Sequence, residues 1–215
     1  MGDVLDLTGD MTISLWEKWS GSGEDCIISK GSEVGGNPGY AIYTTSTTGI
    51  QFELQNTDGT RKYANVTRTA GVWAHIVLTY NSATSTMTPY LNGVAGTPTT
   101  SVSGTFTNAD SLTIGGHSTY SYFYQGSIDD ARIYNRALSA SEITAMYNAG
   151  KVGTWTGRGA DNNWSTAANW AQNTVPTSTT DVVFNNTSSK NCTIDTASVT
   201  VKSFSMNTGY DGTIS

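Results

Sequence analysis

The chain has 215 residues, and its 11 Lys and Arg against 17 Asp and Glu give a formal net charge of −6 at pH 7. Nucleic acid and anionic membrane surfaces both attract basic faces, so this balance argues against either as a partner. Only 13% of the residues are charged while 23 are glycines, a composition typical of short strands joined by turns and poor for helices.

Hydropathy and cysteine content argue against a membrane-spanning protein and against a disulfide-rich or zinc-binding one. No apolar run approaches the roughly 20 residues of a membrane-spanning helix, so we expect no membrane insertion. Residues 1–10 carry neither the basic start nor the apolar core of a signal peptide. Cys26 and Cys192 stand far apart, which predicts two buried free thiols rather than a disulfide framework or a zinc site.

Alternation of apolar and polar residues dominates residues 1–150. The pattern recurs over residues 11–16, 50–55 and 75–80, and a period of two residues predicts strands that bury one face. Turn signals such as Asp58-Gly59 and Asn92-Gly93 separate these runs, because both dipeptides supply the positive φ of tight hairpins. About ten short strands at this spacing predict an all-β fold, an antiparallel β-sandwich.

One short helix is predicted after these strands. Ser139-Ala140-Ser141-Glu142 has the pattern of a capping box, with Ser139 as N-cap and Glu142 three residues later. The apolar stripe of the helix would consist of Ile143, Met146 and Tyr147, and Gly150 suits its end. We expect this helix to pack against the edge of the sandwich.

Charge and tryptophan spacing change near residues 150–153. Residues 1–150 hold 13 acidic and 7 basic side chains, whereas residues 151–215 hold 4 of each. Trp155, Trp164 and Trp170 crowd into one short stretch, while the other tryptophans are spread out. We therefore predict two domains, residues 1–150 and residues 151–215.

An ordered set of short motifs in the first domain resembles a known family. The motifs lie at residues 11–16, 28–31, 73–76, 90–93, 112–116 and 126–139. In this order they are similar to the laminin G-like jelly roll of the concanavalin A-like lectin/glucanase superfamily, over about residues 3–149. The resemblance implies an antiparallel jelly-roll β-sandwich, closed by the short helix.

The sequence departs from that family at its start. Family members usually open with a strand containing a Tyr-Trp pair, an Asp- and Gly-rich loop and a Phe-Asp-Gly strand, all of which would precede Met1. We therefore expect the N-terminal strands of the jelly roll to be missing. A jelly roll without them would expose an unpaired sheet edge.

The second domain resembles a different kind of protein. Its motifs are Trp155-Thr156-Gly157, Asn163-Trp164, Asn169-Trp170, Val175-Pro176 and Asp181-Val182-Val183-Phe184. They are similar to a repeat of large bacterial secreted and surface proteins, including autotransporter-like β-solenoids. The resemblance implies that residues 151–215 form a truncated β-solenoid-like module, with its tryptophans closing the start of the solenoid.

No catalytic constellation is found. Glucanases of the superfamily place their carboxylates as Glu-x-Asp-x-Glu or Glu-x-Asp-x-x-Glu on one strand, and no such run occurs. We expect Glu53, Glu24 and Asp25 to be solvated surface acids. His75 and His117 lack the spacing of metal ligands or of a nucleophile's partner, so His75 is expected to form a structural hydrogen bond and the chain not to be an enzyme.

Asp129 and Asp130 are the candidate metal ligands. Paired carboxylates beside loop carbonyls suit Ca²⁺, which takes six to eight oxygens, and many relatives, by resemblance, bind calcium near the rim of the sandwich. The alternative is that one of these carboxylates pairs with Arg132 within the strand. No other cofactor is expected.

Four aromatic residues are the candidate ligand contacts. The apolar face of a pyranose packs on aromatic rings while its hydroxyls need hydrogen bonds. Tyr120 and Tyr122 lie in an aromatic loop, and Trp16 and Trp19 lie on the strand that opens the domain. The alternative for all four is packing within the sandwich, which we expect for the neighbouring Tyr124.

These observations predict a non-catalytic recognition module of a large secreted or surface bacterial protein. Its expected partner is a polysaccharide, or a glycan or protein on a surface, and its expected location is extracellular or at the cell surface. Two alternatives stay open: a structural adhesin or stalk segment, and an accessory domain of a polysaccharide-degrading enzyme. Fold-level analogy supports binding more than any single residue does.

Overall fold

The computed structural model describes residues 5–21, 23–31, 38–46, 48–117, 123–149, 152–171 and 173–215. The chain forms two compact units, Met1–Thr144 (unit 1) and Ala145–Ser215 (unit 2). This division falls inside the single α-helix of the described residues, a few residues before the change in charge and tryptophan spacing at 150–153. None of the described helices is long and apolar enough to cross a membrane.

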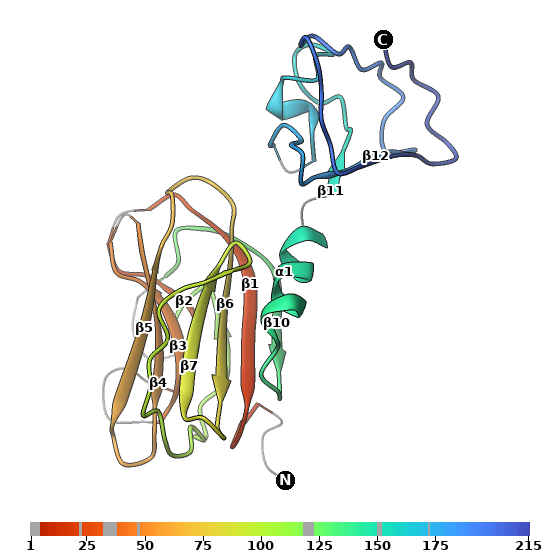
Figure 1. The fold of residues 1–215 in the computed structure, drawn as a ribbon. Coiled ribbons are helices and arrows are strands. Elements are labelled where there is room, and N and C mark those ends of the chain that lie inside the picture. Colours follow the sequence, from red (N-terminus) through yellow and green to blue (C-terminus); the bar gives the residue numbers. More distant parts are fainter. Residues whose placement is uncertain are drawn as a thin grey trace. The chain divides into compact units, whose positions relative to one another are not determined.

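Unit 1 is a sandwich of two five-stranded antiparallel sheets, which Figure 1 shows as two layers. Sheet A has the order β10(Gly126–Tyr134), β1(Met11–Trp19), β6(Ala74–Asn81), β7(Thr86–Leu91), β8(Val94–Ala95). Sheet B has the order β5(Arg61–Thr67), β4(Gly49–Gln55), β3(Gly39–Thr44), β2(Cys26–Lys30), β9(Thr113–Ile114). The predicted antiparallel jelly-roll sandwich is confirmed.

The core of unit 1 follows from the alternation seen in the sequence. Met11, Ile13 and Leu15 of β1 are fully buried, and they pack in one cluster with Ile50 and Phe52 of β4. Successive side chains of a strand point to opposite faces. The polar residues between these apolar positions are therefore placed on the outer faces of the sandwich.

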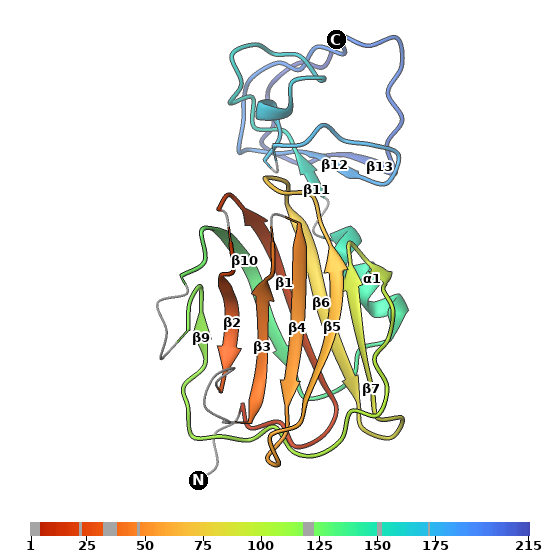
Figure 2. The same cartoon turned by 90° about the vertical axis from the view of Figure 1, so that its left-hand side faces the viewer.

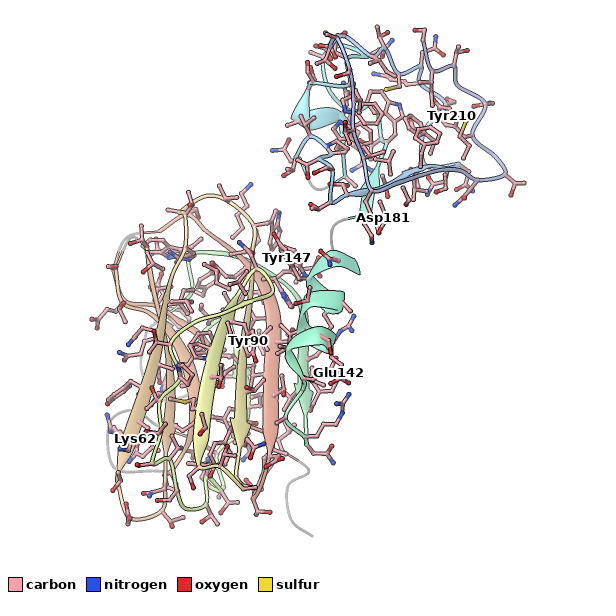
Figure 3. The ribbon with its side chains drawn as sticks, viewed as in Figure 1. Lys62, Tyr90, Glu142, Tyr147, Asp181 and Tyr210 are labelled. Carbon is pink, nitrogen blue, oxygen red and sulfur yellow. The ribbon has the colours of Figure 1, made fainter. Side chains whose placement is uncertain are left out.

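Helix α1(Ala140–Ala149) begins at the predicted capping box. Figure 3 labels Glu142 near the start of this helix. The Ser139 backbone N–H donates to Glu142 Oε2 at 2.8 Å, and the Glu142 N–H donates to Ser139 Oγ at 3.3 Å. Figure 1 shows the helix on the side of sheet A that faces away from sheet B. Thr144 Oγ1 donates to the Gly93 carbonyl at 3.1 Å, and Ile143 is fully buried. The start of the helix thus covers part of the outer face of sheet A.

Unit 2 contains a three-stranded parallel sheet (Figure 2). Its order is β11(Val152–Thr154), β12(Asp181–Phe184), β13(Ser203–Met206), and one short 3₁₀ helix, Ala167–Asn169, lies between the first two strands.

Its core is aromatic: Trp155, Trp164 and Trp170 pack with Phe184, and the Trp164 and Trp170 ring centroids are 4.6 Å apart. The three clustered tryptophans therefore form the interior of unit 2. Cys192 lies in the same core, and Cys26 and Cys192 are both buried and outside any disulfide bond.

Candidate functional site

The outer face of sheet B, the face turned away from sheet A, carries a group of polar and aromatic side chains. In β4, Ile50, Phe52 and Leu54 are buried in the core, so Gln51, Glu53 and Gln55 project from the opposite face. Figure 2 shows sheet B in front of sheet A, with β3, β4 and β5 side by side. In the part of the chain that the structure describes, no helix lies across these strands.

Strand pairing brings the partners from β5 next to these residues. Gln51 is opposite Asn65 and Glu53 is opposite Tyr63. Gln51 Nε2 donates to Asn65 Oδ1 at 3.3 Å, and the Tyr63 side chain is 38% exposed. The Arg61 guanidinium lies near the Glu53–Tyr63 pair, with its Nε 3.5 Å from Glu53 Oε1. We call Gln51, Arg61, Tyr63 and Asn65 the sheet B platform.

The platform has the chemistry of a carbohydrate contact surface. An exposed ring offers a flat apolar surface to the C–H face of a sugar, while amide and guanidinium groups hydrogen-bond its hydroxyls. Glu53 lies beneath the platform, because its side chain is 3% exposed while that of Arg61 is 29% exposed. The ion pair therefore holds the guanidinium in place at the surface.

Two of the acids expected at the surface are instead buried. Glu53 is 2% exposed and Asp25 is 6% exposed. Asp25 Oδ2 accepts hydrogen bonds from Trp19 Nε1 at 3.1 Å and from the Gln125 N–H at 3.3 Å. Buried carboxylates need such partners. Gln125 is 100 positions from Asp25, whereas Arg61 reaches Glu53 across the β4–β5 hairpin. The expectation of solvated acids is therefore wrong for these two residues.

The two candidate tryptophans lie in different surroundings. Trp19 is 1% exposed, and the Arg68 guanidinium lies 4.6 Å from its ring centroid. Its ring offers no surface to a ligand in this conformation. Trp16 is partly exposed on the outer face of sheet A, where its ring centroid lies 5.1 Å from that of His75. The structure therefore does not bring Trp16 and Trp19 together in one patch.

A buried polar cluster surrounds Trp19 at one end of the sandwich. Arg68 Nε lies 2.6 Å from Glu17 Oε1, and the two side chains are 1% and 0% exposed. Tyr124 donates its hydroxyl hydrogen to Glu17 Oε2. Burial raises the pKa of the Glu17 carboxyl, an effect that Tyr124 and Arg68 oppose, and burial also raises the pKa of Tyr124. Glu17, Arg68 and Trp19 are therefore closed to solvent, while Tyr124 at the edge of the cluster is partly exposed.

His75 forms the structural hydrogen bond expected from the sequence. Its Nε2 lies 2.9 Å from Ser14 Oγ, and both residues are 1% exposed. Burial lowers the pKa of His75 to about 4; Asp130 raises this pKa by a smaller amount, and Arg132 lowers it slightly further. A Ser–His pair can activate a nucleophile, but this pair has no access to a substrate.

Asp129 and Asp130 lie at a bulge in the edge strand β10. Asp129 pairs with Trp16 and Arg132 pairs with Ser14, so β10 has one extra residue there, and Asp130 has φ of 49°. Asp130 Oδ1 lies 2.7 Å from Arg132 Nε. The described residues contain no group of three or more His, Cys, Asp or Glu that could hold a metal ion. Two carboxylates, one already paired, supply fewer oxygens than Ca²⁺ takes, so calcium binding here stays a prediction.

A chelator experiment tests the calcium prediction. Because an ion that binds only the folded state stabilises it, we expect Ca²⁺ to raise the unfolding temperature of unit 1 and EDTA, at roughly 5 mM, to reverse the rise. The measurement is differential scanning calorimetry with calcium and with EDTA, for the natural chain and for Asp129→Asn. A rise that Asp129→Asn abolishes would support the metal site. An unfolding temperature that neither calcium nor EDTA changes would contradict it and favour the alternative, in which Asp130 only pairs with Arg132.

Tyr120 and Tyr122 lie outside the described residues. The next residue, Phe123, is 66% exposed and forms a parallel bridge with Cys26 of β2. Both tyrosines stay predicted ligand contacts.

Comparison with known proteins places unit 1 in a family. The family model of the concanavalin A-like lectin/glucanases superfamily matches residues 2–144. The chain belongs to this superfamily. The resemblance seen in the sequence motifs is thereby confirmed for the jelly roll, and the match ends where unit 1 ends. No curated protein matches the chain.

Solved structures with the same fold include several binding domains. The Ruminococcus gnavus IT-sialidase CBM40 bound to α2,3-sialyllactose has a TM-score of 0.58 and 21% identity, covering 66% of this chain and 84% of that one. The binding domain of botulinum neurotoxin serotype D has a TM-score of 0.56 and 17% identity, covering 73% of this chain but 41% of its own. A heptameric SAP-like pentraxin from Limulus polyphemus has a TM-score of 0.52 and 16% identity, covering 65% and 70%. At these identities the likeness concerns the superfamily fold.

The sheet B platform was not among the residues singled out in the sequence. The alternation over residues 50–55 shows the outward polar positions of β4, but Tyr63, Asn65 and Arg61 carry no comparable pattern of their own. The sequence signal that could have found the platform is the Asp58-Gly59 turn, which predicts a hairpin. Residues at equal distances on either side of this turn face each other, so Gln55 lies opposite Arg61 and Glu53 opposite Tyr63.

Proposed function

We propose that unit 1 is a non-catalytic module that binds carbohydrate on the outer face of sheet B. The observation that carries the proposal is the sheet B platform, in which the exposed ring of Tyr63 lies beside the Gln51–Asn65 amide pair and the Arg61 guanidinium. Membership of the lectin/glucanases superfamily supports a binding fold. The solved sialidase module with sialyllactose is one such binding domain.

A binding role is favoured over catalysis by the carboxylate content of this face. Hydrolysis of a glycosidic bond needs two carboxyl groups on either side of that bond. Strands β3, β4 and β5 carry one carboxylate, Glu53, and it is buried and paired with Arg61. A buried carboxylate that is paired with Arg61 does not present its oxygens to a sugar at the surface.

The parent context belongs to the same proposal. We place the module in a secreted or surface protein, where polysaccharide or surface glycan is its partner. Trp16, Tyr120 and Tyr122 are the further proposed ligand contacts. Binding assays of alanine variants distinguish these residues from the sheet B platform.

Affinity electrophoresis through gels containing plant, algal or bacterial polysaccharides tests the platform. We expect retardation by at least one polysaccharide, and we expect Tyr63→Ala to weaken binding by about tenfold, since a lost aromatic contact is worth roughly 1–1.5 kcal/mol. Tyr134→Ala is the matched control, because Tyr134 lies on β10 of the other sheet. It should bind like the natural chain.

Two outcomes would contradict the platform. Binding that survives Tyr63→Ala but is lost in Trp16→Ala or Tyr122→Ala would move the site to those residues. Failure of the folded chain to bind any polysaccharide would remove the proposed function. A stalk segment would then be the better reading, which the parallel stacking of strands in unit 2 specifically favours.

A further inference from the structure

Gln55 is the last residue of β4 and lies on the same outer face of sheet B as the platform. Leu54 is buried in the core, and successive side chains of a strand point to opposite faces, so the Gln55 side chain is placed on the outer face. Its neighbours across the sheet are Arg61 of β5 on one side and Gly39 of β3 on the other. The Gln55 amide therefore stands beside a platform residue and opposite a residue that has no side chain.

The Gln55 side chain is buried although it lies on an outer face. Its exposed fraction is 3%, and its Oε1 has no hydrogen-bond partner in the part of the chain that the structure describes. Burying an amide oxygen without a partner costs free energy, because the oxygen gives up its hydrogen bonds to water. Native proteins satisfy nearly all such groups, so an unsatisfied one points to a function or to a bound group.

The neighbouring Asn56 shows how this chain treats a buried amide that has a structural role. Asn56 is 5% exposed, and its Oδ1 accepts hydrogen bonds from the Asp58 N–H at 3.1 Å and from the Thr60 N–H at 3.0 Å. Its Nδ2 donates to the Ser103 carbonyl at 3.0 Å. Both polar atoms of Asn56 thus hold the turn after β4, whereas Gln55 Oε1 accepts no hydrogen bond from the described residues.

We propose that Gln55 Oε1 accepts a hydrogen bond from a hydroxyl group of the bound sugar, and that the ligand is a neutral polysaccharide in which this hydroxyl is free. The inference rests on the proposed carbohydrate binding and adds to it one contact residue and a ligand class. An amide oxygen accepts hydrogen bonds and donates none, so the matching group of the ligand carries an O–H. A carboxylate or sulfate at that position would place a second acceptor against Gln55.

Charge also favours a neutral ligand over an acidic one. Arg61 is the cation of the platform, and its Nε lies 3.5 Å from Oε1 of Glu53, which neutralises it. The whole chain has a formal net charge of −6 at pH 7, so its field repels a polyanion such as a chain of uronic acids. A neutral polysaccharide supplies the O–H donor without that repulsion.

Gln55 and Tyr63 are placed to contact one ligand. Glu53 lies directly opposite Tyr63, and Gln55 follows two residues later on the same face of β4. Gln55 is therefore a diagonal neighbour of Tyr63, and diagonal neighbours on one face of a sheet are roughly 7–8 Å apart. A sugar ring packed on Tyr63 brings its own hydroxyl groups, or those of the next sugar unit, within reach of Gln55.

The variant Gln55→Met distinguishes a binding oxygen from a structural one. Methionine has a similar length and no amide. Without sugar, we expect its folding equilibrium constant to equal that of the natural chain or to exceed it by up to about tenfold, because the unsatisfied buried oxygen is gone. Asn56→Leu is the matched control and should lower that constant by about tenfold or more, since its amide is fully hydrogen-bonded. Urea unfolding of the full chain, with hydrogen exchange of unit 1 peptides, measures both.

Affinity electrophoresis of the same variants measures binding. The neutral probes are galactomannan, xyloglucan and laminarin, and the acidic probes are alginate and polygalacturonate. We expect at least one neutral probe and neither acidic probe to retard the natural chain. Gln55→Met should weaken that retardation by about tenfold, because the hydroxyl of the sugar loses its acceptor. Tyr63→Ala is measured beside it.

Three results would overturn the inference and leave the proposed function in place. The first is retardation that Tyr63→Ala weakens and Gln55→Met does not, and the second is retardation by the acidic probes alone. The third is a loss of stability in Gln55→Met as large as that in Asn56→Leu, which would make the Gln55 amide structural. A folded natural chain that none of the probes retards would overturn the proposed function and this inference together.

Discussion

Replacing Arg68 with Met is expected to lower the free energy of unfolding of unit 1 by about 3–5 kcal/mol. Arg68 and Glu17 form an ion pair in which both side chains are almost fully buried. Methionine fills the space but leaves the Glu17 carboxylate without its cation in a low-dielectric site. Removing one partner of a buried pair is strongly destabilising for that reason. The measurement is urea unfolding followed by hydrogen exchange of unit 1 peptides, which separates the two units.

The loss should depend on pH in a defined direction. Burial already raises the pKa of Glu17 in the folded protein, and Arg68 opposes that effect. Without Arg68 the pKa of Glu17 rises further, so the carboxyl becomes neutral at a higher pH. The penalty of a buried charge then disappears as the pH falls, and Arg68→Met should be less destabilising at pH 5 than at pH 8.

Arg136 offers a matched control for this experiment. Its Nη2 lies 2.8 Å from Glu142 Oε1, but the two side chains are 54% and 42% exposed. Exposed ion pairs contribute little because water screens both charges, so Arg136→Met should change stability only slightly. Similar losses for Arg68→Met and Arg136→Met, or a loss at Arg68 that does not vary with pH, would contradict the burial of the Glu17–Arg68 pair.

The parts of the fold that could be predicted from the sequence are those with a local pattern. The alternation over residues 11–16 and 50–55 places the core of both sheets, because burial of one face needs nothing beyond that period. The Ser139–Glu142 capping box places the start of α1, because both of its hydrogen bonds join residues three positions apart. Each of these features is complete within a few residues.

The buried polar groups could not be predicted in the same way. Ser14 and His75 are 61 positions apart, and Glu17 and Tyr124 are 107 positions apart. Their partners are decided by how strands from distant parts of the chain are arranged in the sheets. This is why Asp25, whose partner Gln125 is 100 positions away, was expected at the surface, and why Trp19 could not be separated from Trp16. Glu53 was expected there too, although its partner Arg61 lies across the same hairpin. Composition shows that a carboxylate is present, but it does not show which distant donor covers it.

The candidate site is an intermediate case. Its β4 half follows from the alternation over residues 50–55, and its β5 half follows from the Asp58-Gly59 turn once the hairpin is assumed. What neither pattern shows is exposure: Tyr63 is 38% exposed whereas Glu53, directly opposite, is 2% exposed. This difference in exposure depends on the ion pair between Arg61 and Glu53 and on the residues around the outer face of sheet B.

The histidine on the other sheet leads to the second large effect. We expect acidification from pH 7 to pH 4 to reduce the free energy of unfolding of unit 1 by about 3 kcal/mol through His75 alone. Burial lowers the pKa of His75 from 6.5 to about 4, so the folded protein keeps the ring neutral while the unfolded chain takes up a proton. The stabilisation is complete above pH 6.5 and is lost as the pH falls through this range to about 4.

His75→Gln isolates this contribution, because glutamine can still hydrogen-bond Ser14 Oγ but does not titrate. Other acid-sensitive groups, such as Glu142 with its pKa lowered to about 2 by Arg136 and Ser139, are present in both proteins and cancel in the comparison. Urea unfolding of unit 1 at half-unit steps, roughly from pH 7 to pH 4, should therefore give a steeper loss for the natural chain than for His75→Gln. If the two proteins lose stability in parallel, the His75 ring takes up its proton in the folded state as easily as in the unfolded chain. The burial of the Ser14–His75 hydrogen bond between β1 and β6 would then be wrong.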